Sequence, residues 1–230
     1  MGKYYLQDFV IEVTRRCNAE CEHCLRGDAE ENDLDLFELD SFLVNVSGIG
    51  QLTLTGGEPS LAVDKIRGVL DLLKRHSISV DNFYIATNGI NIPQDFLLVC
   101  VDLWLYCKDN EISRVEVSDN MFLDEYDRNY DILEALSFFG KRSRLNLSRD
   151  TQYIVNEGHG SNWGTKNATA EDLIVDPNNR IETMVYFSVH GDICLGCDFS
   201  YDTIDTDNFC DHKVFFEKAE EIKMKNDEDL

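Results

Sequence analysis

The chain has 230 residues, a hydrophobic fraction of 43% and a formal net charge of −23. This length suits one domain or a domain with a small addition, and the hydrophobic fraction excludes a largely disordered chain. So acidic a chain repels phosphate backbones, which argues against nucleic acid as a partner. The longest apolar stretch, residues 96–107, is too short to span a membrane, and the N-terminus lacks the pattern of a signal peptide. We therefore expect no membrane association and a cytoplasmic location.

Predicted strands alternate with predicted helices through the first 150 residues. The expected strands are residues 9–14, 52–55, 83–87, 114–118 and 145–148, and the expected helices are residues 34–46, 64–76, 94–107 and 126–139. Such alternation is typical of parallel strands covered by helices. Because the units are too few for a complete (β/α)8 barrel, the pattern favours an open or partial barrel, or a doubly wound sheet.

The pattern changes after residue 150. A glycine-rich loop at residues 158–164 is followed by a predicted hairpin that begins at residue 184 and a helix at about residues 213–225. We expect a core over residues 1–183 and a C-terminal hairpin and helix over residues 184–230. His159 in the glycine-rich loop is a candidate for gating substrate or donating a hydrogen, although a flexible loop is the interpretation we favour.

Three cysteines follow the first predicted strand. Cys17, Cys21 and Cys24 have the spacing C-x3-C-x2-C, and in a cytoplasmic protein such a cluster indicates a metal site rather than disulfides. Structural zinc sites usually take four protein ligands, and His23, which lies within the loop, is poorly placed to be the fourth. Three cysteines fit an iron–sulfur cluster that leaves one iron open to a substrate or cofactor. Zinc remains the inorganic alternative on this loop alone.

Two further strand ends accompany the cysteines. The second predicted strand ends in Gly-Gly-Glu-Pro at residues 56–59, and the third ends in Thr-Asn-Gly at residues 87–89. Each segment by itself is an ordinary turn signal. In α/β folds, however, ligands bind at the carboxyl ends of the strands. The three features in this order therefore indicate one site.

The cysteine loop (residues 14–24) and these two strand ends together resemble the radical S-adenosylmethionine (SAM) enzymes. The resemblance implies a partial (β/α)6 TIM-like barrel in which Cys17, Cys21 and Cys24 hold a [4Fe-4S] cluster, with SAM on the fourth iron. An external flavodoxin- or ferredoxin-like donor would supply the electron that cleaves SAM. The resulting 5′-deoxyadenosyl radical would then remove a hydrogen atom from the substrate.

The resemblance also implies which residues contact SAM. They are His23, Gly56, Gly57, Glu58, Asn88 and Ser118. The two glycines allow the backbone to approach the methionyl amine, and Glu58 either orients that amine or shapes the turn. Asn88 and Ser118, with Asp119 as an alternative to Ser118, would bind the ribose or the carboxylate. His23 would pack near the adenine, where the family more often has an aromatic residue.

A second group of cysteines lies near the C-terminus. Cys194, Cys197 and Cys210 are followed by His212, and they resemble a shortened form of the hairpin that binds an auxiliary cluster in some radical SAM enzymes. A fourth cysteine is missing locally; Cys107 or Cys100 could supply it, although a small buried hydrophobic residue is the interpretation we favour for both. A Cys3His zinc site is the alternative, and a hairpin without metal is the third possibility. We slightly favour the absence of a complete auxiliary cluster.

The substrate is weakly constrained by the sequence. We expect modification of a peptide or protein, by analogy with small family members that carry C-terminal cysteines. A small molecule or a nucleoside is the first alternative. A non-enzymatic zinc or iron–sulfur protein is the second, and it predicts a metal-loaded chain that neither binds nor cleaves SAM.

Overall fold

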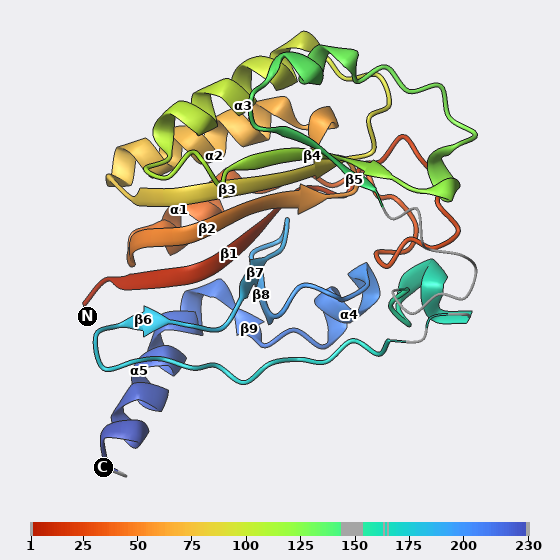
Figure 1. Cartoon of the computed structure of the whole chain (residues 1–230). Helices are drawn as coiled ribbons and strands as arrows, with labels where there is room; N and C mark the ends of the chain where they lie inside the picture. The colour runs from red at the N-terminus through yellow and green to blue at the C-terminus, as the bar shows by residue number, and fades with distance from the viewer. Residues whose placement is uncertain (1, 144–153, 163, 165, 229–230) are drawn as a thin grey trace.

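The computed structural model describes residues 2–143, 154–162, 164 and 166–228 (Figure 1). The described strands form one sheet. In order across the sheet they are β5 (Phe139–Ser143), β4 (Arg114–Asp119), β3 (Ser79–Thr87), β2 (Val46–Gly56), β1 (Tyr4–Thr14), β7 (Val185–Phe187), β8 (Asp192–Leu195) and β9 (Cys210–Asp211), with β6 (Arg180–Ile181) also beside β1. Within the described ranges, no helix has the length and apolar character needed to cross a bilayer.

The sheet is mainly parallel. Strands β1 to β5 pair in parallel with their sequence neighbours, and β6 and β7 pair in parallel with β1. Among the described strands only the β7–β8 and β8–β9 pairs are antiparallel. The predicted α/β class with a parallel sheet is therefore confirmed. Among the described strands β5 and β9 do not pair, so the sheet stays open at both edges and is not closed into a barrel.

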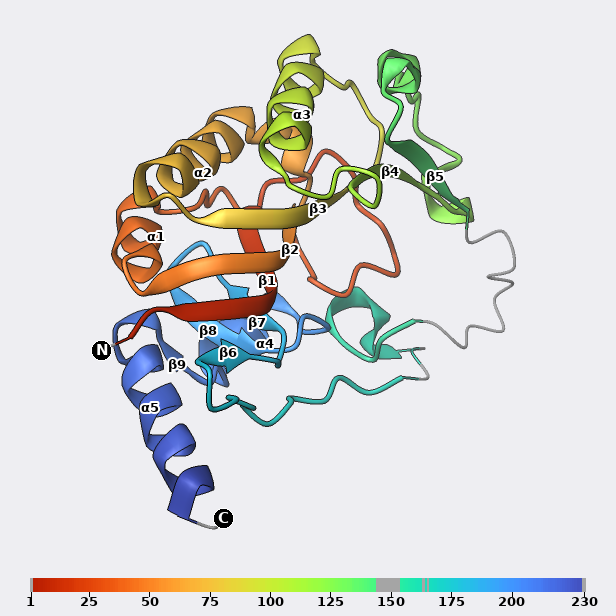
Figure 2. The same ribbon diagram turned by 60° about the vertical axis from the view of Figure 1, so that its left-hand side comes forward.

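Helices cover one face of this sheet, as Figures 1 and 2 show. The described helices on this face are α1 (Leu36–Leu43), α2 (Val63–His76), α3 (Gln94–Tyr106) and α5 (His212–Glu228), whereas α4 (Tyr201–Thr206) packs in the apolar cluster on the other face. The first three form close to where the apolar spacing predicts them. The Asp35 side chain caps the start of α1 by accepting a hydrogen bond from the Phe37 amide, and Ser77 in the left-handed conformation ends α2.

The C-terminal segments share the core beneath these helices. The Phe42 ring of α1 lies 5.4 Å from the ring of Phe9 in β1, 5.3 Å from Phe187 in β7 and 4.8 Å from Phe216 in α5, measured between centroids. The expected C-terminal hairpin is β7–β8, with Gly191 at a φ of +88° in its turn. It extends the main sheet along β1. The division of the chain at residue 184 stays a prediction.

One predicted helix is wrong. Residues 126–139 contain a short 3-10 helix, Asp131–Ala135, and the first residue of β5. Leu133, Leu136 and Phe138 are buried there. The apolar residues whose spacing predicted a helix therefore pack into the core, but the backbone that carries them is a compact turn. The predicted strand at residues 145–148 lies outside the described residues.

Candidate functional site

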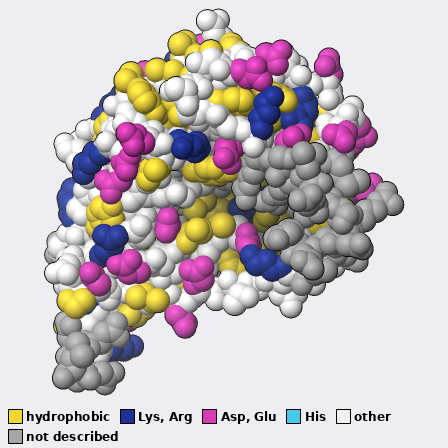
Figure 3. All heavy atoms as spheres, in the orientation of Figure 1, with side chains coloured by type: hydrophobic (Ala, Val, Ile, Leu, Met, Phe, Trp, Pro, Cys, Tyr) yellow, Lys and Arg dark blue, Asp and Glu magenta, His cyan; other side chains and the backbone are white. Residues whose placement is uncertain are grey.

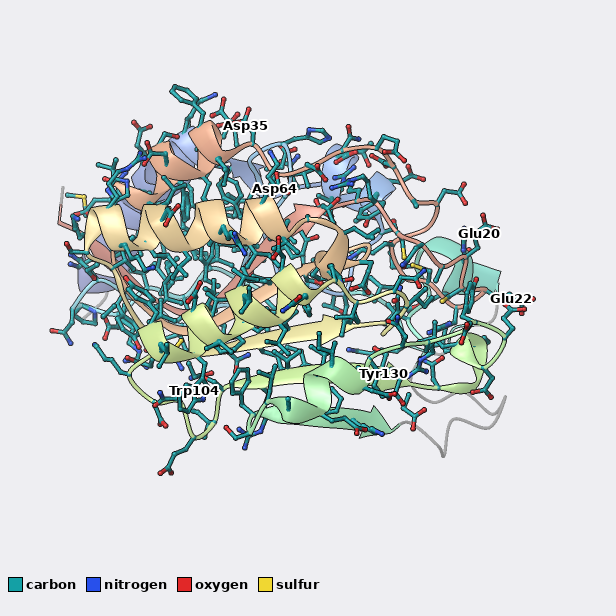
Figure 4. All side chains as sticks on the ribbon, turned by 90° about the horizontal axis from the view of Figure 1, so that it is seen from above. Glu20, Glu22, Asp35, Asp64, Trp104 and Tyr130 are labelled. Carbon is teal, nitrogen blue, oxygen red and sulfur yellow. The ribbon has the colours of Figure 1, made fainter. Side chains whose placement is uncertain are left out.

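The carboxyl ends of β1 to β4 meet at one cavity of about 1740 Å³. It is lined by the residues that the sequence analysis assigned to the cluster or to SAM: Cys17, Cys21, His23, Cys24, Gly56, Gly57, Glu58, Asn88 and Ser118. Asp119, the alternative to Ser118, is not among its lining residues. Figure 4, which shows the molecule from above, places Glu20 and Glu22 of the cysteine loop near each other at one end of the molecule, on the right of the view. Residues that are up to 101 positions apart, from Cys17 to Ser118, therefore line one space.

The three thiols of the loop are partly buried and unpaired with one another. Burial raises the pKa of Cys17 above its ordinary value. Burial, together with the neighbouring Cys24 and Cys17 thiols, raises the pKa of Cys21 to about 12. A bound metal centre would lower the pKa of these thiols instead, because the metal replaces the thiol proton on ligation.

Two glycines bring the end of β2 against the start of the cysteine loop. Gly56 has a φ of +149°, and a Cβ atom there would lie 2.0 Å from the Thr14 carbonyl oxygen. A Cβ atom on Gly57 would lie 2.3 Å from the Arg16 carbonyl oxygen. The Gly57 and Glu58 amides donate hydrogen bonds to the Thr14 and Arg16 carbonyls, each at 2.8 Å. Because no side chain fits at either glycine, the pair is required by the backbone itself.

Glu58 is 1% exposed and joins the ends of β2 and β3. One carboxylate oxygen accepts hydrogen bonds from the Thr87 hydroxyl at 2.6 Å and the Ser60 amide at 3.0 Å, and the other accepts from the Asn88 amide at 2.7 Å. Burial raises the pKa of Glu58, and these donors oppose the increase. The carboxylate thus shapes the turn and places Asn88.

Asn88 and His23 have neighbours of their own. The Asn88 side-chain amide donates to Asn18 Oδ1 at 2.8 Å and lies 3.9 Å from Cys17 Sγ. The His23 ring stacks on Phe122, with 4.0 Å between centroids and 19° between planes. The Phe122 contact was not predicted, because this residue follows β4 and carries no motif.

No family model matches the chain. Its sequence is 34% identical over 88 residues to the GTP 3′,8-cyclase of Chlorobaculum tepidum, a radical SAM enzyme, and this match covers 36% of the chain and 26% of the cyclase. The chain therefore shows sequence similarity to a radical SAM enzyme, in keeping with the motifs of the cysteine loop and the two strand ends. It spans about a quarter of the length of this curated relative.

Two solved radical SAM structures also align with this chain. One is anSMEcpe with bound AdoMet and the Cp18Cys peptide, at 18% identity over 50% of this chain and 31% of the other, with a TM-score of 0.37. The other is Streptococcus suis SuiB bound to precursor peptide SuiA, at 12% identity over 84% and 60%, with a TM-score of 0.41. Both TM-scores are below 0.5, so neither alignment establishes a shared ligand.

The residues of the second cysteine group, Cys194, Cys197 and Cys210, are not brought together. The β8–β9 register pairs Ile193 with Cys210, and both belong to the core beneath the helices. Cys194 belongs to a separate apolar cluster on the other face of the sheet, with Cys197 packed against it. Neighbouring residues on a strand point to opposite faces. Cys210 therefore cannot share an ion with the other two.

His212 does not complete a zinc site with these cysteines either. Its ring is buried, with Nδ1 3.1 Å from the Gly191 carbonyl oxygen and Nε2 2.9 Å from Ser41 Oγ. Among the described residues, no three His, Cys, Asp or Glu side chains are grouped to hold a metal ion. The Cys3His alternative is therefore wrong for this arrangement.

Sequence reasoning missed several residues that line this cavity. Arg15, Arg26 and Tyr201 line the cavity, and the two arginines flank the cysteine motif closely enough to have been candidates. His159, which the sequence analysis named as a candidate, also lines the cavity. Its ring lies between the Cys21 carbonyl oxygen, at 3.1 Å, and Asp28 Oδ1, at 2.9 Å. These two acceptors raise the pKa of His159. Tyr201 had no local signal in the sequence.

Proposed function

We propose that this chain is a radical SAM enzyme in which Cys17, Cys21 and Cys24 hold a [4Fe-4S] cluster, and which cleaves SAM to form the 5′-deoxyadenosyl radical. The observation that supports this proposal most is the shared cavity. The three thiols open into the same space as the glycine-rich end of β2 and the Asn88 end of β3. These are the segments that the superfamily resemblance assigns to the cluster and to SAM.

The donor set fits such a cluster better than a single ion. All three ligands are cysteines, the residues that bind iron–sulfur clusters. Structural zinc sites usually take four protein ligands, and this loop supplies three cysteines. In a [4Fe-4S] cluster each cysteine binds a different iron, and three cysteines leave one iron open. When bound and reduced, the cluster supplies the electron that breaks a carbon–sulfur bond of SAM.

The remaining site residues are proposed to bind and orient SAM. Gly56 and Gly57 allow the end of β2 to pack closely against the start of the cysteine loop. Because they carry no side chains, their backbone is open to the methionyl group of SAM. Glu58 fixes the Asn88 backbone, so that the Asn88 amide, together with Ser118, is placed to bind the ribose or the carboxylate. We place the adenine beside the stacked His23 ring.

A peptide or protein side chain is the proposed substrate. The cavity of about 1740 Å³ exceeds the range of about 300–1,000 Å³ that is typical of small-molecule pockets, so it has room for a second ligand beside SAM. The net charge of −23 disfavours a polyanionic nucleotide at long range. A nucleoside or small molecule is the second candidate, because the curated relative is named for GTP.

The cluster and SAM cleavage are tested together. The protein is purified without oxygen, reconstituted with iron and sulfide, reduced and incubated with SAM. We expect bound iron and 5′-deoxyadenosine. Cys17→Ala should lose both, whereas Cys100→Ala, which removes a buried thiol in α3 outside the site, should keep both. A Cys17→Ala variant that still cleaves SAM, or a wild-type chain that binds zinc and ignores SAM, would refute the proposal.

The substrate class is tested by isotope transfer. Candidate peptides and nucleosides carrying deuterium are added to the reduced enzyme with SAM, and the deuterium content of the 5′-deoxyadenosine is measured. Transfer from a peptide supports the substrate proposed here. Transfer from a nucleoside alone overturns the peptide proposal and leaves the radical SAM activity in place.

A further inference from the structure

We infer that α4 and the two residues before it, Phe199 and Ser200, position the cysteine loop by holding both of its ends. This short segment, named here the α4 clamp (residues 199–206), belongs to the C-terminal part of the chain, to which the sequence assigned no such role. The inference deepens the proposed function and rests on it, because the loop carries the cysteines that are proposed to bind the cluster.

The clamp holds the first end of the loop through Arg15. This residue lies two positions before Cys17 and is 0% exposed. Its two terminal nitrogens donate to the Asp205 carboxylate at 2.8 and 2.6 Å, and its guanidinium lies 4.4 Å from the centre of the Tyr201 ring. A buried cation is costly unless it is paired, and a bidentate carboxylate is its strongest partner. Glu12 and Glu30 also bind this guanidinium, at 3.3 and 3.1 Å. Asp205 makes the shortest contacts of the three carboxylates and is the only one of them to accept from both terminal nitrogens, so the clamp helps to fix where the loop begins.

The clamp holds the second end through Arg26. This residue lies two positions after Cys24, and only 9% of it is exposed. Its guanidinium donates to the Phe199 carbonyl oxygen, and its own carbonyl accepts from the Tyr201 amide at 3.0 Å. The same guanidinium lies 4.8 Å from the centre of the Tyr186 ring in β7. Tyr201 thus contacts both ends of the loop, one with its ring and one with its backbone.

A third contact joins the clamp to the middle of the loop. Glu157 accepts a hydrogen bond from the Ser200 amide at 3.0 Å, which connects it to the start of α4. Two residues later, the His159 amide donates to the Cys24 carbonyl at 2.9 Å, and its ring contacts the Cys21 carbonyl. The clamp and residues 157–159 therefore support the loop along its length.

These contacts matter because the loop has little regular structure of its own. Between Arg16 and Gly27 the described chain forms neither a helix nor a strand. Three thiols must keep their places at once to hold one cluster, so the loop needs support from outside itself. Asp205 acts through Arg15 and is a positioning residue, not a ligand.

The clamp is tested by Asp205→Asn, with Asp207→Asn, at the C-cap of the same helix, as the matched control. Asp207 is exposed and lies at the opposite end of α4 from the Arg26 contact. We expect amide hydrogen exchange over residues 15–27 of the iron-free protein to be about tenfold faster in Asp205→Asn, as loss of a charge-assisted contact predicts. In the reconstituted protein, a chelator should remove iron correspondingly faster. Asp205→Glu should restore both rates in part.

Tyr201 provides a second test that does not depend on Asp205. Tyr201→Leu removes the ring under Arg15 and should loosen the same amides, whereas Tyr201→Phe keeps the ring and should behave like wild type. If Asp205→Asn and Tyr201→Leu both exchange no faster than Asp207→Asn, the clamp is wrong. Because exchange is read without iron, this result stands even if the wild-type chain binds no cluster, which would instead refute the proposed function.

Discussion

At the residue scale, Glu58 shows how one side chain serves both the fold and the candidate site. It is buried, and its two oxygens accept hydrogen bonds from Thr87, Ser60 and Asn88. Of the two roles that the sequence allowed for it, the turn-shaping role is visible in these contacts. Orientation of the SAM amine stays a proposal, since both oxygens are already engaged by donors of the protein.

Glu58→Gln tests this structural role. The amide nitrogen of glutamine must face one of the donors that now bind the carboxylate, which leaves a buried donor unsatisfied. We expect a loss of about 1–3 kcal/mol in the free energy of unfolding, measured by urea denaturation. Glu31→Gln, at an exposed position, is the control. Equal stability of the two variants would contradict the role assigned to Glu58.

The residues of the site differ in how far the sequence could predict them. The cysteines, the glycine pair and Asn88 were predictable, because each belongs to a short motif at the end of a strand. The contact of Arg15 with Asp205 joins residues 190 positions apart, and no local pattern reports a pairing over that distance. The sequence therefore indicated what chemistry the loop carries, but not what holds the loop.

At the element scale, the helices that the sequence predicted correctly are those with a regular apolar face. Residues 126–139 had apolar residues at suitable spacings but formed a 3-10 helix. There Phe138 stacks on Trp104 of α3, with 5.6 Å between centroids, and Asn129 Oδ1 accepts from the Ile92 amide. Tertiary contacts with α3 and with the residues before it therefore determine the conformation of this segment. The spacing of apolar residues in the sequence does not reveal such contacts.

A second contact at this scale ties the cysteine loop to the segment before α1. The Asp33 carboxylate accepts from Arg16 Nε at 2.8 Å and from the Thr14 hydroxyl at 2.6 Å. Partial burial works to raise its pKa, but the Arg16 and Thr14 hydrogen bonds outweigh burial and hold the pKa of Asp33 below its ordinary value. Because the folded-state pKa is the lower one, this stabilisation is complete above the unfolded-state pKa of about 4 and is lost as the pH falls through the folded-state value.

Asp33→Asn should remove this contribution of Asp33 to the pH dependence of stability. We expect the variant to be less stable by about 1 kcal/mol at pH 7, and its stability to decline less steeply below about pH 4 than that of wild type. The measurement is denaturant unfolding over a series of pH values, with Asp71→Asn, at an exposed position of α2, as the control. Unfolding curves that match wild type at every pH would exclude this contribution of the ion pair.

At the scale of the whole molecule, the C-terminal strands and α5 complete the core of the parallel sheet. Strand β7 pairs with β1 across 176 positions, from Phe9 to Val185, and sequence order alone could not place it there. Acidic side chains are spread over the face drawn in Figure 3, in keeping with the net charge. The fold class was predictable from the alternation of strands and helices in the sequence, whereas the position of β7 beside β1 was not.

Truncation tests how far the first part of the chain depends on the rest. A chain ending at residue 183 lacks β7 and α5, so Phe9 and Phe42 lose the aromatic rings that cover them. We expect this truncated chain to fail to fold cooperatively, as judged by circular dichroism and thermal unfolding. A chain ending at residue 225, which keeps Phe215 and Phe216, should unfold like the full chain. Cooperative unfolding of residues 1–183 would instead support an independent core domain.

The central claim is that the cysteine loop carries a cluster with one iron open to SAM. The most direct measurement is electron–nuclear double resonance on the reduced, reconstituted protein with SAM labelled by 15N at the amine and 17O at the carboxylate. The account predicts magnetic coupling of both labels to the cluster, which requires that SAM binds an iron directly. Cluster signals that are unchanged by labelled SAM at saturating concentration would contradict it.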